Sequence, residues 1–358
     1  MDLTQARETK AHLATYARDL AERYGVAVTP QAAAAPCAPA EAVRAPTLAI
    51  GLAPSDEPGG YQIAVRYRLG VPAARAVVRR VAAEAGSSPD VRRTGRIRRL
   101  GPGRRGSTAG GMLEPQPPVA TAQAAGETGR VRPLRPGVSI AHVDVTAGTL
   151  GGFVVVDPAR SEGHDLPGGP DALYALSNRH VLDGVPGDGV LQPGPADGGT
   201  DPADRVGTVA AVVPLTAGER ATVDAAVALL DDPQVDLEYP VGRVTTTAEA
   251  APGDTVEKIG RTTGHTHGRV SAIEMDDVLV GYGPELGVLA FDGQIEVEST
   301  APGPFSRGGD SGSLVYRSDG VAVGLLFAGS ETGGADGSGL TYVNPIDAVL
   351  ATFGVSLR

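Results

Sequence analysis

The chain has 358 residues, a formal net charge of −11 and 41% hydrophobic residues, with 50 glycines and 29 prolines. This length exceeds what a single hydrophobic core usually organises, so two folding units are expected. The abundant turn-forming residues favour an all-β domain and argue against a large helical bundle. The acidic balance argues against nucleic acid or an anionic membrane as a partner, because neutralising phosphates requires a clustered positive surface.

Cysteine content and the N-terminal residues bear on the cellular compartment. Cys37 is the only cysteine, so no disulfide can form within the chain, which favours a reducing environment. The first eight residues include acidic groups where a signal peptide needs a basic start and then an apolar stretch. No apolar run approaches the roughly 20 residues of a membrane-spanning helix. We therefore expect a cytoplasmic protein without membrane insertion, and an inert thiol at Cys37, which has no basic neighbour to activate it.

Residues 1–100 are expected to form a small α+β domain. Asp2 can cap a first helix, and Gly25 can end it. Apolar and polar residues alternate strictly from Tyr61 to Leu69, which predicts a strand with one buried face. The predicted order is helix 2–25, strand 47–52, strand 61–69, helix 72–86 and strand 91–100.

The remainder of the chain changes composition twice. Residues 101–135 are rich in Gly, Pro and Arg with almost no large apolar side chain, which predicts a flexible linker. Residues 136–358 contain short apolar segments separated by Gly, Pro and Asp turns, which is typical of two successive β-barrels. A helix near 346–353 is expected to close the chain.

Three segments of this second part contain residues suited to nucleophilic catalysis. In Gly308-Gly309-Asp310-Ser311-Gly312-Ser313, small residues allow a tight turn that exposes the Ser311 hydroxyl and aligns backbone amides. His180 follows an apolar strand segment, where its imidazole can project into a cleft. Asp224 is embedded in apolar residues, and burying its charge requires a partner. Alone, the first segment could be a glycine-rich loop and His180 a structural histidine.

The three motifs occur in the order His, Asp, Ser, which differs from the order in subtilisin and in α/β-hydrolases. From about Gly137 onward, the sequence resembles the trypsin-like serine proteases of the chymotrypsin fold. The resemblance implies a double β-barrel, a triad of His180, Asp224 and Ser311, an oxyanion hole made by the Gly309 and Ser311 amides, and no cofactor. It also implies a protein or peptide substrate.

A fourth segment, from Gly260 to Val270, is similar to the start of the second barrel in streptogrisin-like bacterial proteases. In those relatives an arginine pairs with the acid before the nucleophilic serine, so the resemblance implies an ion pair between Arg261 and Asp310. A surface turn with a solvated arginine is the alternative. The overall layout resembles, more loosely, the plant narrow-leaf-type trypsin-like proteins and their bacterial relatives.

The same alignment implies where the residue before the cleaved bond would bind. Strong preference for Arg or Lys requires a buried counter-charge, and no acidic residue occurs in the expected pocket. We therefore expect preference for an apolar or small residue. Phe327 also stands where relatives often have a serine that bonds the catalytic aspartate. The expected pocket residues are Phe305, Ser306, Phe327, Ala328 and Gly329.

Two further features, a pair of histidines and an arginine-rich stretch, are interpreted as structural. His265 and His267 can point the same way on a strand, but no Cys or third His is nearby in sequence, so no metal site is expected. The arginine-rich stretch lacks aromatic residues for base stacking, which favours a solvated face or an acidic partner over nucleic acid. Its members are Arg92, Arg93, Arg96, Arg98, Arg99, Arg104 and Arg105.

Three functional hypotheses follow. The first is an intracellular, bacterial-type serine endopeptidase whose N-terminal domain binds a regulatory partner or restrains the active site. The second is a protease-fold binding module with little or no activity, because a fold does not guarantee a function. The third is an enzyme that becomes active only after assembly or after removal of residues 1 to about 130.

Overall fold

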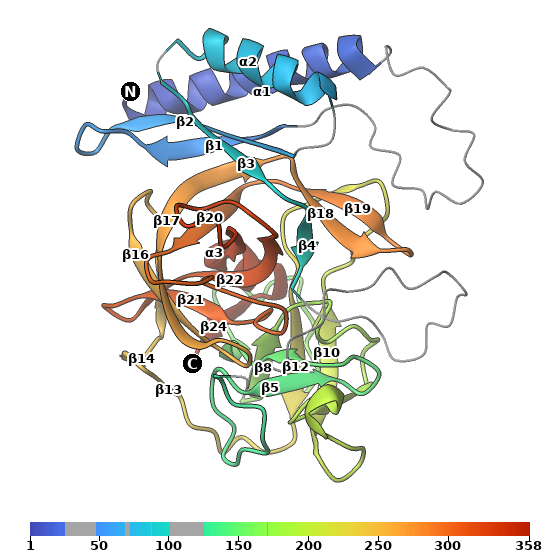
Figure 1. The fold of residues 1–358 in the computed structure, drawn as a ribbon. Coiled ribbons are helices and arrows are strands. Elements are labelled where there is room, and N and C mark those ends of the chain that lie inside the picture. The colour runs from blue at the N-terminus through green and yellow to red at the C-terminus, as the bar shows by residue number, and fades with distance from the viewer. Residues whose placement is uncertain (26–47, 69–71, 87, 101–124, 170) are drawn as a thin grey trace.

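The computed structural model describes residues 1–25, 48–68, 72–86, 88–100, 125–169 and 171–358. Cys37 and most of the predicted linker lie outside these residues, and the division into domains stays a prediction. Figure 1 shows two helices above a sheet, with two β-rich bodies below them. Within the described part of the chain, no helix is both long and apolar enough to cross a membrane.

The N-terminal part is a layer of two helices on a three-stranded sheet. Asp2 caps the first helix, because its Oδ1 accepts a hydrogen bond from the Gln5 amide at 2.9 Å. Leu13 and Leu20 are buried on one side of this helix and pack into one cluster with Ile63 and Val65 of the sheet. The elements are α1 (Leu3–Gly25), β1 (Leu48–Pro54), β2 (Tyr61–Arg68), α2 (Pro72–Glu84) and β3 (Asp90–Thr94).

Strand β2 is buried on both faces, so the prediction of one buried face was wrong. Ile63 and Val65 pack under the helices, as the alternation indicated. Ala64 and Arg66, expected to face solvent, are also buried, with exposed fractions of 0% and 1%. The reason is that this second face packs against the next body of the molecule. Strand β1 pairs with β17 of that body, through Ile50 opposite Asp276 and Leu52 opposite Ile273.

The second β-rich body is a closed barrel of six strands. Each strand pairs with the next until β21 returns to β16. Around the barrel the strands are β16 (Thr255–Gly260), β17 (Gly264–Asp276), β20 (Gln294–Ser299), β23 (Thr341–Pro345), β22 (Val321–Ser330) and β21 (Leu314–Arg317). The hairpin of β18 (Val278–Gly283) and β19 (Gly287–Phe291) projects from it, and β11 (Arg220–Ala221) and β15 (Thr246–Thr247) add short pairings.

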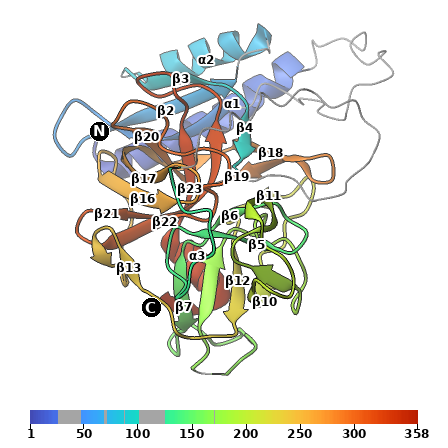
Figure 2. The ribbon, with the colours of Figure 1, turned by 60° about the horizontal axis from the view of Figure 1, so that its bottom comes forward.

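The first β-rich body is a strongly curved sheet of eight strands. In spatial order it contains β24 (Val355–Leu357), β7 (Gly152–Val156), β8 (Tyr174–Ser177), β12 (Ala226–Leu230), β10 (Arg205–Val212), β9 (Gly189–Leu191), β5 (Ser139–His142) and β6 (Gly148–Thr149). The pair β13 (Glu238–Tyr239) and β14 (Gly242–Arg243) and the 3-10 helix Pro195–Asp197 lie outside this order. The closing helix α3 (Ile346–Phe353) packs into the core of this body, as Figure 2 also shows. The predicted fold, a chymotrypsin-like double β-barrel preceded by an α+β unit, is confirmed.

The predicted strand 91–100 is divided in two. Strand β3 ends at Thr94 within the N-terminal sheet, and β4 (Ile97–Arg99) leaves that sheet. Strand β4 lies between β22, with which it pairs antiparallel, and β18, with which it pairs parallel. In Figure 1 it is the teal strand that descends from β3 beside β18. The N-terminal part thus contacts the second barrel through both β1 and β4.

Candidate active site

His180 and Asp224 meet where two neighbouring strands of the first body leave the sheet. His180 follows the end of β8, and Asp224 lies two residues before β12, which pairs with β8. The His180 Nδ1 atom lies 2.5 Å from Asp224 Oδ2, and the His180 amide donates to Oδ1 at 3.2 Å. Both side chains are buried. The carboxylate therefore fixes the orientation of the imidazole and leaves Nε2 pointing away from it.

A tyrosine that the sequence analysis did not find also binds this carboxylate. The Tyr282 hydroxyl, from β18 of the second barrel, donates to Asp224 Oδ2 at 2.5 Å. Burial would raise the pKa of Asp224, but the charge and hydrogen bonds of His180 and the bond from Tyr282 lower it below its usual value. Burial and the neighbouring carboxylate raise the pKa of Tyr282, which keeps the phenol protonated as a donor.

Ser311 lies in a turn that only glycines can form at two positions. Gly309 and Gly312 have φ angles of +100° and +93°. A Cβ atom on Gly312 would lie 2.2 Å from the Oγ atom of Ser177, at the end of β8. The turn is thus packed against the strand that leads to His180, and the Thr149 amide donates to the Ser311 carbonyl at 2.8 Å. The structure brings the Ser311 loop to the boundary of the two bodies, where His180 and Asp224 lie.

The Ser311 hydroxyl bonds a carbonyl group in this conformation. It donates to the Phe327 carbonyl at 3.3 Å. His180 Nε2 is buried and has no hydrogen-bond partner among the described residues. A buried nitrogen without a partner is costly, so Nε2 is the ring atom left to bond a hydroxyl group. Hydrogen bonds between nucleophile and base are often absent until a substrate binds.

The predicted ion pair between Arg261 and Asp310 was wrong. The Arg261 guanidinium binds both carboxylate oxygens of Asp197, with Nε 2.6 Å from Oδ2. Asp310 is buried and accepts instead from the backbone amides of Thr262 and Thr263, at 2.9 and 3.1 Å. The buried Lys258 ammonium lies 3.8 Å from its Oδ2 atom. Backbone amides and one lysine can satisfy a buried carboxylate, so the arginine is free for another acid.

The expected pocket residues divide between two apolar clusters. Phe305 packs in the core of the second barrel, next to Gly268, and the Ser306 hydroxyl lies 2.7 Å from Thr341 Oγ1. Phe327 and Ala328 belong to a different cluster, in which the Phe327 ring lies 4.8 Å from that of Phe291. Gly329 follows them on β22. Phe305 and Phe327 therefore lie in different clusters, and the Cβ position of Gly329 faces Leu100, which packs against the cluster of Phe305.

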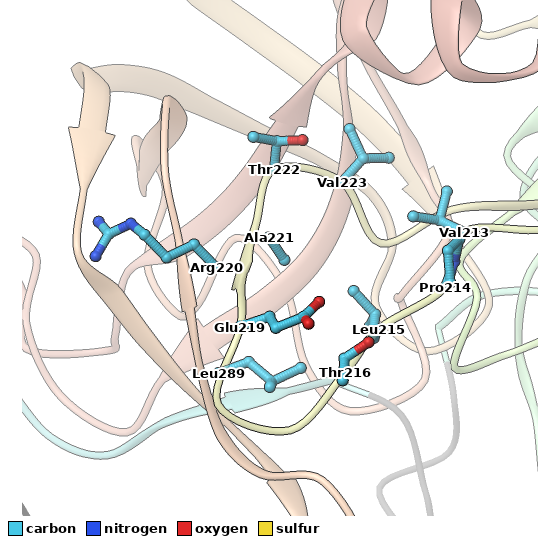
Figure 3. A pocket seen from close by; sticks show the side chains of 10 residues that line it. All are labelled: Val213, Pro214, Leu215, Thr216, Glu219, Arg220, Ala221, Thr222, Val223 and Leu289. Carbon is cyan, nitrogen blue, oxygen red and sulfur yellow. The ribbon is translucent and has the colours of Figure 1, made fainter.

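A pocket elsewhere on the surface contains no part of the triad. It is lined by residues 213–216, 219–223 and Leu289, between the loop that precedes Asp224 and strand β19 (Figure 3). The Glu219 carboxylate lies beside Leu215 and Thr216, whereas Arg220 extends away from them. Arg220 instead binds Asp277 and Asp292. Without a nucleophile and base in contact, this pocket does not suit covalent catalysis.

His265 and His267 have a third potential ligand that their sequence neighbourhood did not indicate. Glu257 on β16 joins them, and one ligand atom from each of the three residues lies within 4.8 Å of the others. Two imidazoles and a carboxylate suit a zinc-like ion. Glu257 already bonds His265 Nε2 at 2.8 Å, which gives the group a structural role without an ion.

No family model matches the chain, and no curated protein matches it. Solved structures of bacterial serine proteases are similar to 63% of the chain. Thermobifida fusca protease A is 22% identical, is covered over 97% of its length and has a TM-score of 0.42. The Cellulomonas bogoriensis chymotrypsin is 20% identical, with 98% of its length covered and a TM-score of 0.40. The Nocardiopsis protease is 18% identical, with 98% covered and a TM-score of 0.42. Sequence identities and TM-scores this low assign no activity to this chain.

Proposed function

We propose that this chain is a serine endopeptidase in which His180, Asp224 and Ser311 form the catalytic triad. The observation that carries the proposal is the buried bond between His180 Nδ1 and Asp224 Oδ2, 2.5 Å long. It leaves His180 Nε2 without a hydrogen-bond partner among the described residues. The glycine turn that presents Ser311 packs against Ser177, three residues before His180. A buried carboxylate held against an imidazole in this way fixes the orientation of the ring and stabilises the positive charge that the ring acquires when it takes up a proton.

Each residue has a defined role in this mechanism. Ser311 Oγ attacks the carbonyl carbon of the peptide bond, and His180 Nε2 accepts its proton. Asp224 stabilises the resulting imidazolium, and the Gly309 and Ser311 amides stabilise the negative oxygen. His180 then gives the proton to the leaving amine. A water molecule, deprotonated by His180, then attacks the ester on Ser311 and releases the acid and the free hydroxyl. We expect a preference for substrates with an apolar or small residue before the cleaved bond.

A protease-fold binding module is the second candidate. The observation in its favour is that the Ser311 hydroxyl bonds the Phe327 carbonyl instead of His180 Nε2. In such a protein, the cleft would bind a peptide without cutting it. The endopeptidase requires that the Ser311 hydroxyl move from the Phe327 carbonyl to the imidazole.

Labelling of the full-length chain with a fluorophosphonate at neutral pH, followed by peptide mapping, separates the two. The endopeptidase predicts an adduct on Ser311 that Ser311→Ala abolishes. Ser318→Ala is the matched control, because Ser318 is exposed in the turn between β21 and β22, and its labelling should equal that of the wild type. Absence of the adduct from folded protein with an accessible cleft would contradict the endopeptidase and favour the binding module.

A further inference from the structure

Leu100 contacts the candidate active site through its backbone. Its amide donates to the Phe327 carbonyl at 3.1 Å, the same oxygen that accepts the Ser311 hydroxyl. Its carbonyl accepts a hydrogen bond from the Gly309 amide at 2.5 Å. Gly309 is one of the two proposed oxyanion-hole donors. Leu100 thus has its carbonyl oxygen where the oxygen of a cleavable bond is expected, next to the nucleophile.

The Leu100 side chain fills the space above Gly329. A Cβ atom built on Gly329 would lie 3.0 Å from Leu100 Cδ2. The side chain packs against the apolar cluster that contains Phe305. Phe305 and Gly329 are two of the expected pocket residues, so a leucine occupies the pocket for the residue before the cut.

The residues before Leu100 continue as an added strand. Arg99 lies opposite Ala328, Arg98 opposite Gly329 and Ile97 opposite Ser330, all antiparallel. Ile97 packs against the cluster of Tyr282 and Phe327, whereas Arg98 is exposed. Adding an extended strand to a sheet edge is a common way to bind peptides, in which the backbone provides affinity and alternate pockets provide selectivity.

The burial of the triad fits an occupied cleft. The exposed fractions are 2% for His180 and 0% for Ser311. A hydrolase must admit both a polypeptide and water to its nucleophile, so this nucleophile is closed to substrate while Leu100 is bound. The Arg98 guanidinium lies 3.7 Å from Glu331, with both side chains about half exposed, a pairing of low strength. The contacts of Ile97 and Leu100 and the backbone bonds therefore hold the segment.

We propose that the cleft binds extended polypeptide segments with leucine before the cut and an apolar residue three positions earlier, and that Ile97–Leu100 is such a ligand bound in cis. This inference rests on the proposed function for the meaning of the cut, but the binding itself requires no catalysis. The segment competes with any substrate, so the cleft is available only in the fraction of molecules in which β4 has left.

Binding measured in a Ser311→Ala background tests the proposal without activity. The probe is a fluorescent peptide with the sequence Ile-Arg-Arg-Leu, followed by fluorescence anisotropy. Leu100→Asp places a charge in an apolar pocket, and we expect it to release β4 and tighten peptide binding at least about tenfold. Val91→Asp is the matched control on β3, where the side chain is 36% exposed, and should leave binding unchanged. A second peptide, Ile-Arg-Arg-Asp, should not bind either variant.

Equal binding of the leucine peptide to the Leu100→Asp and Val91→Asp chains would overturn the proposal. If Leu100→Asp prevents folding, Leu100→Gly serves instead, because it removes only the side chain from the pocket. Hydrogen exchange of the Gly309 amide provides a second readout. The amide should be protected in the Ser311→Ala chain and lose protection when Leu100 is replaced, and unchanged protection would also overturn the proposal.

Tight peptide binding to the Leu100→Asp chain without fluorophosphonate labelling of Ser311 would refute the endopeptidase but not the binding of Ile97–Leu100 in the cleft.

Discussion

The N-terminal part is attached to the second barrel at two places that differ in construction. At the first, β1 pairs with β17, and Arg66 of β2 binds Glu296 of β20 through bonds of 2.8 to 3.0 Å with both side chains buried. At the second, the three residues of β4 pair with β22, and the Arg98 side chain is about half exposed. The first attachment is built to persist. The second, which covers the candidate active site, is built so that it can be released.

The buried attachment should be the most sensitive to mutation. Burial would lower the pKa of Arg66, but the charge of Glu296 raises it above its usual value, so the guanidinium stays charged. Arg66→Met leaves Glu296 buried without its partner and should lower the free energy of unfolding by about 3–5 kcal/mol. Thermal unfolding followed by circular dichroism measures this. Arg205→Ala, which breaks the exposed pair with Asp201, should leave the melting temperature unchanged, and equal effects of the two variants would contradict the comparison.

The two attachments should differ in their rates of amide hydrogen exchange in the unmodified protein. Central strand β1 is paired on both sides, to β2 and β17. We expect the Leu100 amide to exchange at least about a hundredfold faster than the slowest amides of β1, a difference of about 2.7 kcal/mol in opening free energy. Similar rates at Leu100 and Leu52 would show that β4 is held as firmly as the rest of the sheet.

Tyr282 should act as a positioning residue for the carboxylate, next to the releasable attachment. Tyr282→Phe removes one bond to Asp224 and retains the two from His180, so kcat/KM should fall about tenfold, mainly through kcat. The activity is measured in a Leu100→Asp background with a peptide ester. Tyr316→Phe is the matched control, because the buried Tyr316 hydroxyl has no partner among the described residues. A rise in KM at constant kcat would argue against a role in positioning.

Acid should weaken the first attachment, between the N-terminal sheet and the second barrel, by less than Arg66→Met does. Burial would raise the pKa values of Asp90 and Glu298, but bonds from Arg66 and Arg92 to Asp90, and from Arg269 and Arg92 to Glu298, lower them. Carboxyl groups with lowered pKa values stabilise the fold above their unfolded values of about 4. That contribution is lost as the pH falls through the folded values. Melting temperature should therefore drop below about pH 4, and less steeply in Arg92→Ala; identical slopes would contradict this assignment.

The architecture could be predicted because it follows from local patterns. The alternation in 61–69 correctly indicated a strand, and the turn residues with the order of the motifs correctly indicated a double β-barrel. The capping role of Asp2 was also evident, since it depends on the first turn alone. The meeting of His180 with Asp224 was predicted from the resemblance and from the cost of a buried carboxylate.

The remaining features depend on long-range pairing. Tyr282 reaches Asp224 across the two bodies, and no spacing in the sequence indicates that contact. The partner of Arg261 is Asp197, on a 3-10 helix of the first body, and no spacing in the sequence indicates that contact. Asp310 instead accepts hydrogen bonds from three backbone amides and the Thr263 hydroxyl and lies near Lys258. The burial of Arg66 required knowledge that a second sheet covers β2. Ile97–Leu100 appeared only as the end of a predicted strand, because its position in the cleft is set by the tertiary fold.

Active-site titration of the full-length Leu100→Asp chain shows whether Ser311 is the nucleophile. The reagent is the p-nitrophenyl ester of an N-blocked leucine, and the readout is the burst of p-nitrophenol together with the mass of the Ser311 peptide. We expect one equivalent of p-nitrophenol and an acyl group on Ser311, both absent in the same chain with Ser311→Ala. A folded Leu100→Asp protein that binds the Ile-Arg-Arg-Leu peptide but gives neither burst nor acyl group would contradict the assignment of Ser311 as a nucleophile.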